Sequence, residues 1–378
     1  MSDERRDMTP AVGEPASPSF GTEVGSGVPL QRDGWGDGRW SYLYKDDTGY
    51  ATADGVSETV AEAAVRMRNG PLGEVAHGMM KPPVWTWEVP LYFWTGGIAS
   101  GSAFVALACD LAGDHRSARI ARLVSLVALA PSPPLLVLDL GRPERFLHML
   151  RIFKTRSPMS MGAWALTLFG NLAAAAVGAD LLGRERTARA IGGSNAIVGG
   201  YLGSYTGVLL ASTAVPLWAR SKLFLGPIFV CTATATGAAA TRLVLVASGV
   251  APGHPTRQAL GQVQAGAMLA ELALSTVNER RLGRHAEPLH RSTKLKWAKR
   301  LVGAGLGLQL LRRRAGRPEA GHAASVLYLL AGLLFRYAWV EAGPVSARDD
   351  RSVAELSREK RPSPDGVSPG SPSSGSRP

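Results

Sequence analysis

Cysteine is almost absent from this chain of 378 residues. There are two, Cys109 and Cys231, and each lies inside an apolar run. An iron–sulfur cluster needs about four cysteine ligands, so we expect no cluster in this chain. Neither cysteine has a partner at metal-ligand spacing, and we therefore interpret both as packing residues and expect no metal site.

Histidine is present but is not placed to hold a membrane haem. None of the seven histidines lies in the middle of an apolar run, whereas a membrane cytochrome b holds its haem between paired histidines inside its helices. The chain also lacks a Walker loop, a dinucleotide-binding fingerprint and a defensible nucleophile–histidine–aspartate pattern. We expect no haem and no catalytic centre, so the electrons for any redox chemistry must come from a partner subunit.

Long apolar runs dominate the middle of the chain. The mean hydropathy of +0.03 averages polar ends, 1–80 and 346–378, with a stretch, 81–345, in which apolar runs alternate with short basic loops. We expect both ends to be largely disordered and the middle to be a membrane domain. The net charge of +12 is then explained by basic loops beside membrane spans, so we expect membrane lipid and no nucleic acid as a partner.

Eight apolar runs are candidate transmembrane helices. The expected fold is therefore an all-α integral membrane protein with about eight spans, which could form two four-helix bundles. The candidate spans are 89–111, 118–140, 159–182, 192–216, 224–247, 259–277, 299–311 and 322–342. The seventh is short and could instead be re-entrant or interfacial.

Proline and glycine predict local features of these spans. "PSPP" at 131–134 predicts a kink in the second span, because proline removes a backbone donor and clashes with the preceding turn. "GGIASG" at 96–101 and "GGYLGSYTG" at 199–207 predict close approach of the first and fourth spans to their neighbours, since small residues favour helix packing in lipid.

The densest polar sequence joins the second and third spans. The segment "DLGRPERFLHMLRIFKTRSPMSMGAW" runs from Asp139 to Trp164 and carries five arginine and lysine residues. Its apolar positions predict a short helix along the membrane surface with the basic side chains extending toward water. Asp139 and Arg142 are three residues apart, within ion-pairing reach, and the pair could be a purely structural anchor.

The ends of the first four spans share one membrane face and carry aromatic and titratable side chains. A quinone head group needs hydrogen bonds to two carbonyls, flat apolar walls and titratable neighbours that supply two protons. We expect the quinone site to be formed by Glu88, Tyr92, Asp139, Met159, Trp164 and Tyr205. We expect a partner-facing or structural role for Trp87, Arg142, Arg145 and Ser157.

With these residues the chain resembles the NrfD/polysulfide reductase membrane-subunit family. The similar stretches are "PVWTWEVPLYFWTGGIASG", the 139–164 segment, "YTGVLL" and "LFRYAWVEAG". The resemblance implies an eight-helix subunit of the cell membrane with no redox centre of its own. It also implies a four-cluster ferredoxin-like iron–sulfur partner, a molybdopterin catalytic subunit, similar to formate dehydrogenase complexes, and electron exchange with quinone, which we expect to be menaquinone.

The chain departs from the family pattern in its first helix. Where a polysulfide reductase has asparagine and histidine, this sequence has Val89 and Tyr92. Tyr92 can still donate a hydrogen bond, and Glu88 adds a titratable group beside the missing asparagine. Tyr205 is expected to be the tyrosine partner of the quinone. The departure leaves the orientation of the quinone and its proton source open.

Two charged residues lie inside expected spans and allow other functions. Glu271 and Arg336 should face the bundle interior or each other, because a charge in lipid is costly. They could form a structural pair or a proton relay. They would also suit a secondary transporter, which is the alternative function together with a purely structural membrane anchor.

Overall fold

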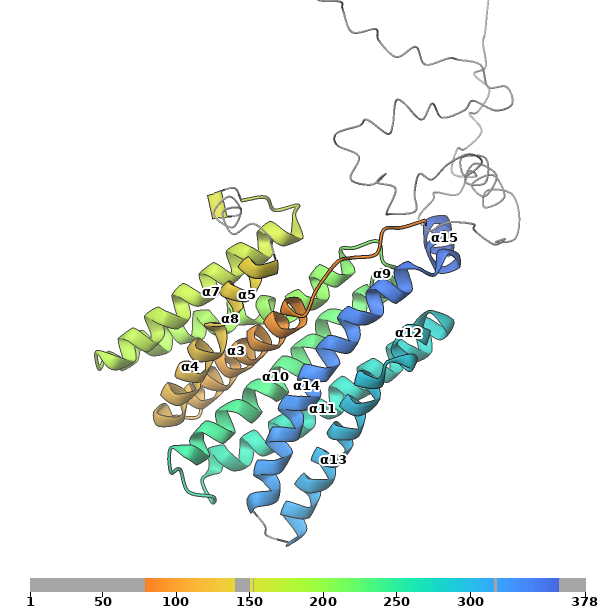
Figure 1. The fold of residues 1–378 in the computed structure, drawn as a ribbon. Coiled ribbons are helices and arrows are strands. Elements are labelled where there is room, and N and C mark those ends of the chain that lie inside the picture. The colour runs from red at the N-terminus through yellow and green to blue at the C-terminus, as the bar shows by residue number, and fades with distance from the viewer. Residues whose placement is uncertain (1–78, 140–149, 152, 316–317, 360–378) are drawn as a thin grey trace, which may run out of the picture.

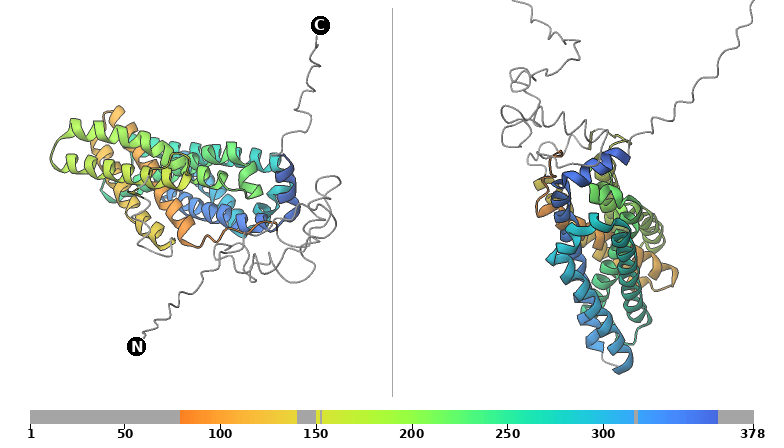
Figure 2. Two further views of the ribbon diagram at one scale, coloured as in Figure 1. Left: turned by 90° about the horizontal axis from the view of Figure 1, so that it is seen from above. Right: turned by 90° about the vertical axis from the view of Figure 1, so that its right-hand side faces the viewer.

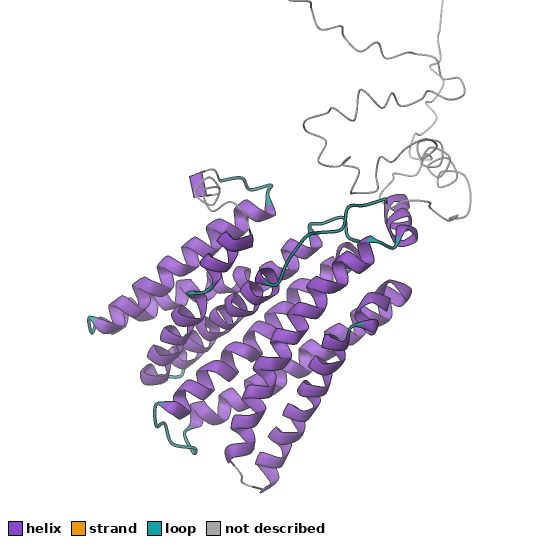
Figure 3. Cartoon of the chain, in the orientation of Figure 1, coloured by secondary structure: helices purple, strands orange, loops and turns teal. Residues whose placement is uncertain are grey.

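The computed structural model describes residues 79–139, 150–151, 153–315 and 318–359. Within these ranges every regular element is a helix, which confirms the expected all-α class (Figure 3). The long helices are α3 (Glu88–Leu111), α4 (His115–Leu129) continued by α5 (Ser132–Asp139), α7 (Pro158–Leu181), α8 (Glu185–Ala211), α10 (Lys222–Ala247), α11 (Pro255–Leu282), α13 (Thr293–Ala315) and α14 (Pro318–Ala347). Short elements complete the described chain: α9 (Pro216–Arg220), η2 (Gly283–Ala286), α12 (Glu287–Arg291) and α15 (Asp350–Glu359).

The long helices follow the eight expected spans in order. Five of these segments in the described chain are long and apolar enough to cross a membrane: α3, α4 with α5, α7, α10 and α14. Helices α8, α11 and α13 have similar lengths but are less apolar. The seventh span, expected to be short, is the 23-residue helix α13, which is long enough to cross a bilayer but is not among the five described segments that are also apolar enough.

Two boundaries differ from expectation. The proline-rich stretch does more than kink the second span, because α4 ends at Leu129 and α5 begins anew at Ser132. The expected C-terminal tail from 346 is also corrected: α14 continues to Ala347, and α15 extends to Glu359. Charged and apolar residues alternate with helical spacing in α15, so its apolar side can pack while its charges face water. Residues 1–78, 140–149 and 360–378 lie outside the described chain.

The long helices pack as two groups of four, as expected (Figure 1). Helices α3, α4 with α5, α7 and α8 form the first bundle, and α10, α11, α13 and α14 form the second. The bundles meet where α10 packs against α3 and α8, and where α14 packs against α3. Figure 2 shows the yellow-green helices of the first bundle beside the teal and blue helices of the second.

Glycine lets the two bundles approach closely. A methyl group on Gly101 of α3 would overlap the backbone at Ala233 of α10, and one on Gly237 of α10 would overlap the backbone at Gly101. Gly207 of α8 likewise lies directly against the backbone of α10 at Leu225. These contacts confirm the close packing that the glycine-rich stretches predict, because helix association in lipid depends on van der Waals contact.

An extended stretch, 79–87, crosses the end of the second bundle before α3 begins (Figure 1). The backbone N–H of Met79 donates to Asp350 of α15 at 2.7 Å. The Trp85 ring stacks on the buried Trp218 ring with a centroid distance of 5.0 Å, and the Trp218 indole donates to the carbonyl of Trp339 at 3.0 Å. These contacts hold the entry to α3 in place.

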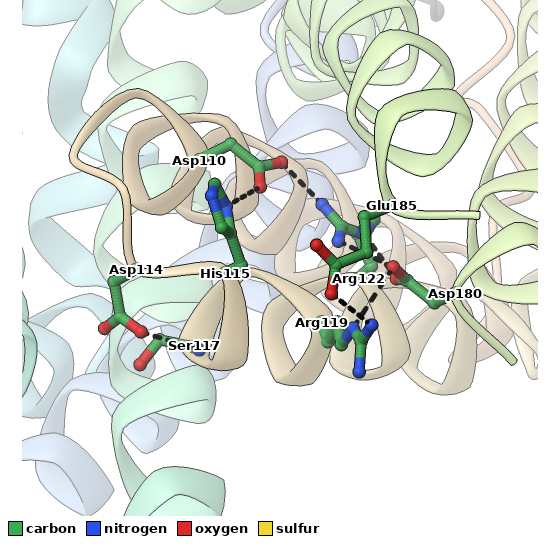
Figure 4. A network of polar contacts seen from close by, with 8 residues as sticks. All are labelled: Asp110, Asp114, His115, Ser117, Arg119, Arg122, Asp180 and Glu185. Atoms are coloured by element: carbon green, nitrogen blue, oxygen red, sulfur yellow. Dashed lines mark hydrogen bonds and ion pairs between the residues drawn. The ribbon is translucent and has the colours of Figure 1, made fainter. Parts of the chain in front are cut away.

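A buried ionic network closes the opposite end of the first bundle (Figure 4). Arg122 of α4 is 4% exposed. It donates to Asp110 of α3 at 2.5 Å and to both carboxylate oxygens of Asp180 of α7 at 2.6 and 2.9 Å. Arg119 extends the network to Glu185 at 2.7 Å. The buried arginine charge is therefore compensated by two carboxylates with good geometry.

Candidate functional site

One pocket opens where the first four spans end on a common face. Its cavity volume is about 50 Å³. It is lined by Trp85, Val89 and Tyr92 near the start of the first span, Leu135, Leu136 and Asp139 of α5, Met159, Gly162 and Ala163 of α7, and Tyr205 and Leu209 of α8. Apolar side chains thus surround three polar groups that come from three different helices.

Tyr92 supplies an uncommitted hydroxyl to this pocket. Its side chain is buried, with 7% of its surface exposed. The hydroxyl makes no hydrogen bond to any described residue. The guanidinium of Arg336 of α14 lies within electrostatic range of it. The hydroxyl oxygen is not among the fully buried polar atoms that lack a partner, so it is open to the pocket and can donate to a ligand carbonyl there.

Tyr205 lies in the same pocket, but its hydroxyl already has a partner. The hydroxyl donates to the carbonyl of Pro158 at the start of α7 at 3.1 Å. The side chain can lie there because Gly162, one turn further along α7, has no side chain. A methyl group at that position would overlap the Tyr205 ring and hydroxyl. Tyr205 is therefore fixed as a wall of the pocket, and Tyr92 is the freer donor.

Two carboxyl groups lie at the mouth of the pocket. Asp139 is the last residue of α5, is exposed, and lines the pocket. Glu88 is half-buried in the first turn of α3, within electrostatic range of Asp139, and it accepts a hydrogen bond from Thr86. Glu88 does not line the pocket itself. The pair combines an apolar binding site with acid groups that can reach water.

The other residues expected at the site divide into three groups. Met159 lines the pocket with 53% of its surface exposed, whereas Trp164 lies outside the lining and packs edge-on against Phe153. Trp87 is 55% exposed, and Ser157 caps α7 by accepting from the Ser160 N–H. Ser157 therefore has a structural role. Arg142 and Arg145, and the surface helix expected around them, lie outside the described residues.

Glu271 and Arg336 both face the protein interior but do not form the expected pair. Arg336 is 1% exposed, donates to the Thr206 hydroxyl at 2.7 Å and lies over the Phe229 ring at 4.7 Å. Glu271 is 5% exposed and accepts from the Ser275 hydroxyl at 2.6 Å. The two charges lie in different environments, so the interpretation as an ion pair is corrected.

The sequence reasoning missed the apolar walls of the pocket and the glycine that shapes it. Leu135, Leu136, Ala163 and Leu209 look like ordinary span residues, because lipid-facing and pocket-facing positions are equally apolar. Gly162 lies inside the quoted 139–164 segment. Gly162 lies one helical turn after the first residue of α7. A glycine at that place in a helix was the one available sign that another side chain packs closely there. In the described part of the chain, no group of three or more His, Cys, Asp or Glu residues could hold a metal ion.

Comparison with known proteins assigns the chain to a family. The family model described as "Polysulphide reductase, NrfD" matches residues 75–277, which is more than half of the chain. The search of curated proteins found no match to the chain. The match includes both halves of the pocket and agrees with the resemblance of the sequence motifs. The chain therefore belongs to the NrfD polysulphide reductase family, whose members are the multi-pass membrane subunits of molybdopterin oxidoreductase complexes.

Proposed function

We propose that this chain anchors an iron–sulfur subunit and a molybdopterin subunit to the cell membrane and exchanges electrons between the iron–sulfur partner and quinone. Family membership supports the anchoring role, since NrfD subunits generally associate with such partners and react with quinones. The pocket carries the rest of the proposal, because it combines Tyr92, Asp139 and Tyr205 with apolar walls at the membrane face.

In this proposal the quinone ring enters the pocket past Met159. Methionine is flexible, and the exposure of Met159 leaves it room to move. The Tyr92 hydroxyl donates to one quinone carbonyl, because that hydroxyl has no partner among the described residues. Tyr205 and Trp85 provide flat walls that orient the ring. We expect the ligand to be menaquinone.

Reduction of the quinone to quinol takes two electrons and two protons. The electrons come from the iron–sulfur partner, because we expect no haem or cluster in this chain. Asp139 is the group placed to pass protons between water and the bound ring, since it is exposed on one side and lines the pocket on the other. Glu88 is close enough to share this role.

Arg336 belongs to this proposal and Glu271 does not. The Arg336 charge lies within electrostatic range of Tyr92 and would stabilise negative charge that develops on the reduced ring. It could also take part in proton transfer as a relay next to Tyr92. Glu271 makes no described contact with the pocket, and its hydrogen bond to Ser275 stays within α11.

The test is the Asp139→Asn variant in the assembled complex. We expect quinone-linked electron transfer to slow while the partner subunits remain bound, because the amide keeps the shape of Asp139 but cannot be a proton carrier. Glu341→Gln is a matched control, since Glu341 is an exposed carboxylate paired with Lys294 outside the pocket. Loss of partner binding in Asp139→Asn, or loss of activity in both variants, would favour a purely structural anchor.

A photoreactive azido-quinone provides a second, independent test. Label should be recovered from peptides of α3, α5, α7 and α8. Label recovered only from α10 to α14 would place the site in the second bundle and overturn the proposal.

A further inference from the structure

Three arginines cluster at the end of the second bundle that lies away from the quinone pocket. Arg242 lies near the end of α10, Arg257 near the start of α11 and Arg312 near the end of α13. Arg242 and Arg257 are 2% and 4% exposed. The Arg242 and Arg312 side chains both pack against Gly321 of α14, where a methyl group would overlap them.

The hydrogen-bond partners of these arginines are neutral. Arg242 donates to the carbonyl of Arg257 at 3.2 Å and to the Ser325 hydroxyl at 2.9 Å, and it also contacts the carbonyl of Gly321. Arg257 contacts the carbonyl of Val250 and lies 2.8 Å from the His322 ring nitrogen. Arg312 donates to the Gln309 amide oxygen at 3.3 Å.

No described carboxylate forms an ion pair with any of the three. The ion pairs of the described chain involve other cations. Glu319, in the first turn of α14, is exposed and acts electrostatically on His322. The three guanidinium groups instead lie within electrostatic range of one another.

The first bundle neutralises its buried arginine with carboxylates from neighbouring helices. At the same membrane face, Arg122 is held between Asp110 and Asp180 (Figure 4). The two networks are neighbours, because Thr256, beside Arg257, contacts Asp114 in the loop that follows α3. The second bundle therefore has buried cations where the first has matched pairs.

Two donors in this cluster also lack an acceptor. The buried Nε of Arg257 and the buried Nε2 of Gln264 have no hydrogen-bond partner. Buried polar groups normally have one, and an uncompensated buried charge is strongly unfavourable. An anion with several acceptor oxygens would satisfy the charge and the donors together. Arginine binds phosphate well, because its planar fork can donate two parallel hydrogen bonds.

We propose that Arg242, Arg257 and Arg312 form a binding site for a phosphate group, supplied by the headgroup of an anionic phospholipid. Helices α10, α11, α13 and α14 begin or end at this site, and the ends of membrane-spanning helices lie near the lipid headgroups. Basic pockets between transmembrane helices are a known mode of binding acidic lipid headgroups. Free phosphate has the same chemistry and is the other source to be distinguished.

The test measures thermal unfolding of the delipidated full chain in neutral detergent. Phosphatidylglycerol should raise the unfolding temperature, whereas phosphatidylcholine, which has no net charge, should not. Arg312→Gln should weaken the apparent affinity for phosphatidylglycerol about tenfold or more, the value typical of a lost hydrogen bond to a charged group. Arg186→Gln is the matched control: Arg186 is exposed on the same membrane face, at the start of α8.

The unfolding temperature without lipid separates a binding role from a structural one. Removing one of three mutually repelling cations should leave it unchanged or raise it. The proposal would be overturned if Arg312→Gln had a lower unfolding temperature without lipid and phosphatidylglycerol still raised that temperature as much as in the wild type. Arg257→Gln gives an independent second variant with the same expectation for lipid affinity.

Sodium phosphate, compared with sodium chloride at equal ionic strength, identifies the source of the phosphate group. If phosphate raises the unfolding temperature as much as the lipid does, and Arg312→Gln abolishes that rise, the site binds a free anion. No shift with phosphate, together with the expected lipid shift, would assign it to the headgroup. If neither probe shifts the unfolding temperature, the cluster does not bind phosphate.

Discussion

Tyr205 of α8 crosses α7 at Gly162, and the absence of a side chain there lets its hydroxyl reach the Pro158 carbonyl. This relationship sets the shape of the pocket, because both residues line it. It also decides which tyrosine is available to a ligand. Tyr205 is committed to the backbone of α7, whereas the Tyr92 hydroxyl has no described partner.

Gly162→Ala should therefore disturb the pocket. The added methyl group must displace the Tyr205 ring, so we expect weaker quinone binding and a destabilisation of about 1–3 kcal/mol, typical of overpacking. Gly178→Ala, on the same helix with nothing within 4 Å, is the control. The control should leave quinone binding unchanged. Titrating either fluorescence quenching or activity against quinone concentration measures the affinity of both variants. Equal quinone affinities for the two variants would contradict this role of Gly162.

Tyr92→Phe should reduce quinone affinity more than Tyr205→Phe. Loss of one neutral hydrogen bond costs about 0.5–1.5 kcal/mol, or roughly 2- to 13-fold in affinity. Tyr92→Phe removes the donor proposed for the quinone carbonyl and leaves no other described group unpaired. Tyr205→Phe should mainly affect stability, because it removes the hydrogen bond that joins α8 to the Pro158 carbonyl of α7. Quinone-binding curves and unfolding temperatures of both variants measure the two effects. If Tyr205 were the main donor, Tyr205→Phe would lose more quinone affinity than Tyr92→Phe.

Arg122→Ala should strongly destabilise the first bundle. It removes the cation that joins Asp110 and Asp180 and leaves them only the longer contacts with His115 at 3.4 Å and Arg119 at 3.6 Å. Breaking a buried ion pair by removing one partner costs about 3–5 kcal/mol. Arg122→Lys should recover part of the loss, since it restores the charge but not the two-pronged contact with Asp180. Unfolding in mixed micelles measures both variants. A loss under about 1 kcal/mol for Arg122→Ala would show that Arg119 or water already compensates the aspartates.

Docking of α15 should weaken in acid. His285 contacts Ser352 at 2.9 Å and Glu355 at 3.3 Å, both on α15. Burial, with the nearby charges of Arg220 and Arg284, lowers the pKa of His285 below its usual value of about 6.5. When η2 and α15 unfold together, the imidazole therefore takes up a proton more readily than in the folded protein, although Glu355 acts in the opposite direction. The resulting contribution to the stability of this folded region is present above about pH 6.5 and is lost as the pH falls through the lowered pKa.

Glu355 adds a second step in the same direction at lower pH. Its hydrogen bond with Arg284 lowers the pKa of its carboxyl, so that contribution is lost as the pH falls through a value under the usual range near 4.3. Amide hydrogen exchange of 351–357, corrected for the intrinsic pH dependence, measures the docking. His285→Gln should remove the first step and keep the second. A wild-type response that is flat from pH 7 to pH 5 would rule out the histidine effect.

The order of the long helices could be predicted from the apolar runs alone. Apolar length is a local property that the bilayer thickness sets, so the runs near α3, α7 and α10 could be read directly. Local chemistry also predicted a disturbance of the second span at the proline-rich stretch, as a kink rather than the full break before α5, and the contact glycines, such as Gly101. The family motifs added the class of protein, and three of the four quoted stretches lie within the segment that the family model matches, whereas "LFRYAWVEAG" lies beyond it.

Which residues meet depends on how the helices pack. Lipid-facing and protein-facing positions of a membrane helix are both apolar, so the sequence pattern does not determine how each helix is rotated. The rotation separates Arg336 from Glu271 and brings it near Tyr92 instead. It also gives Arg122 two aspartates while leaving Arg242 with neutral partners. Such contacts depend on the depth and packing of helices far apart in the chain, which local sequence does not encode.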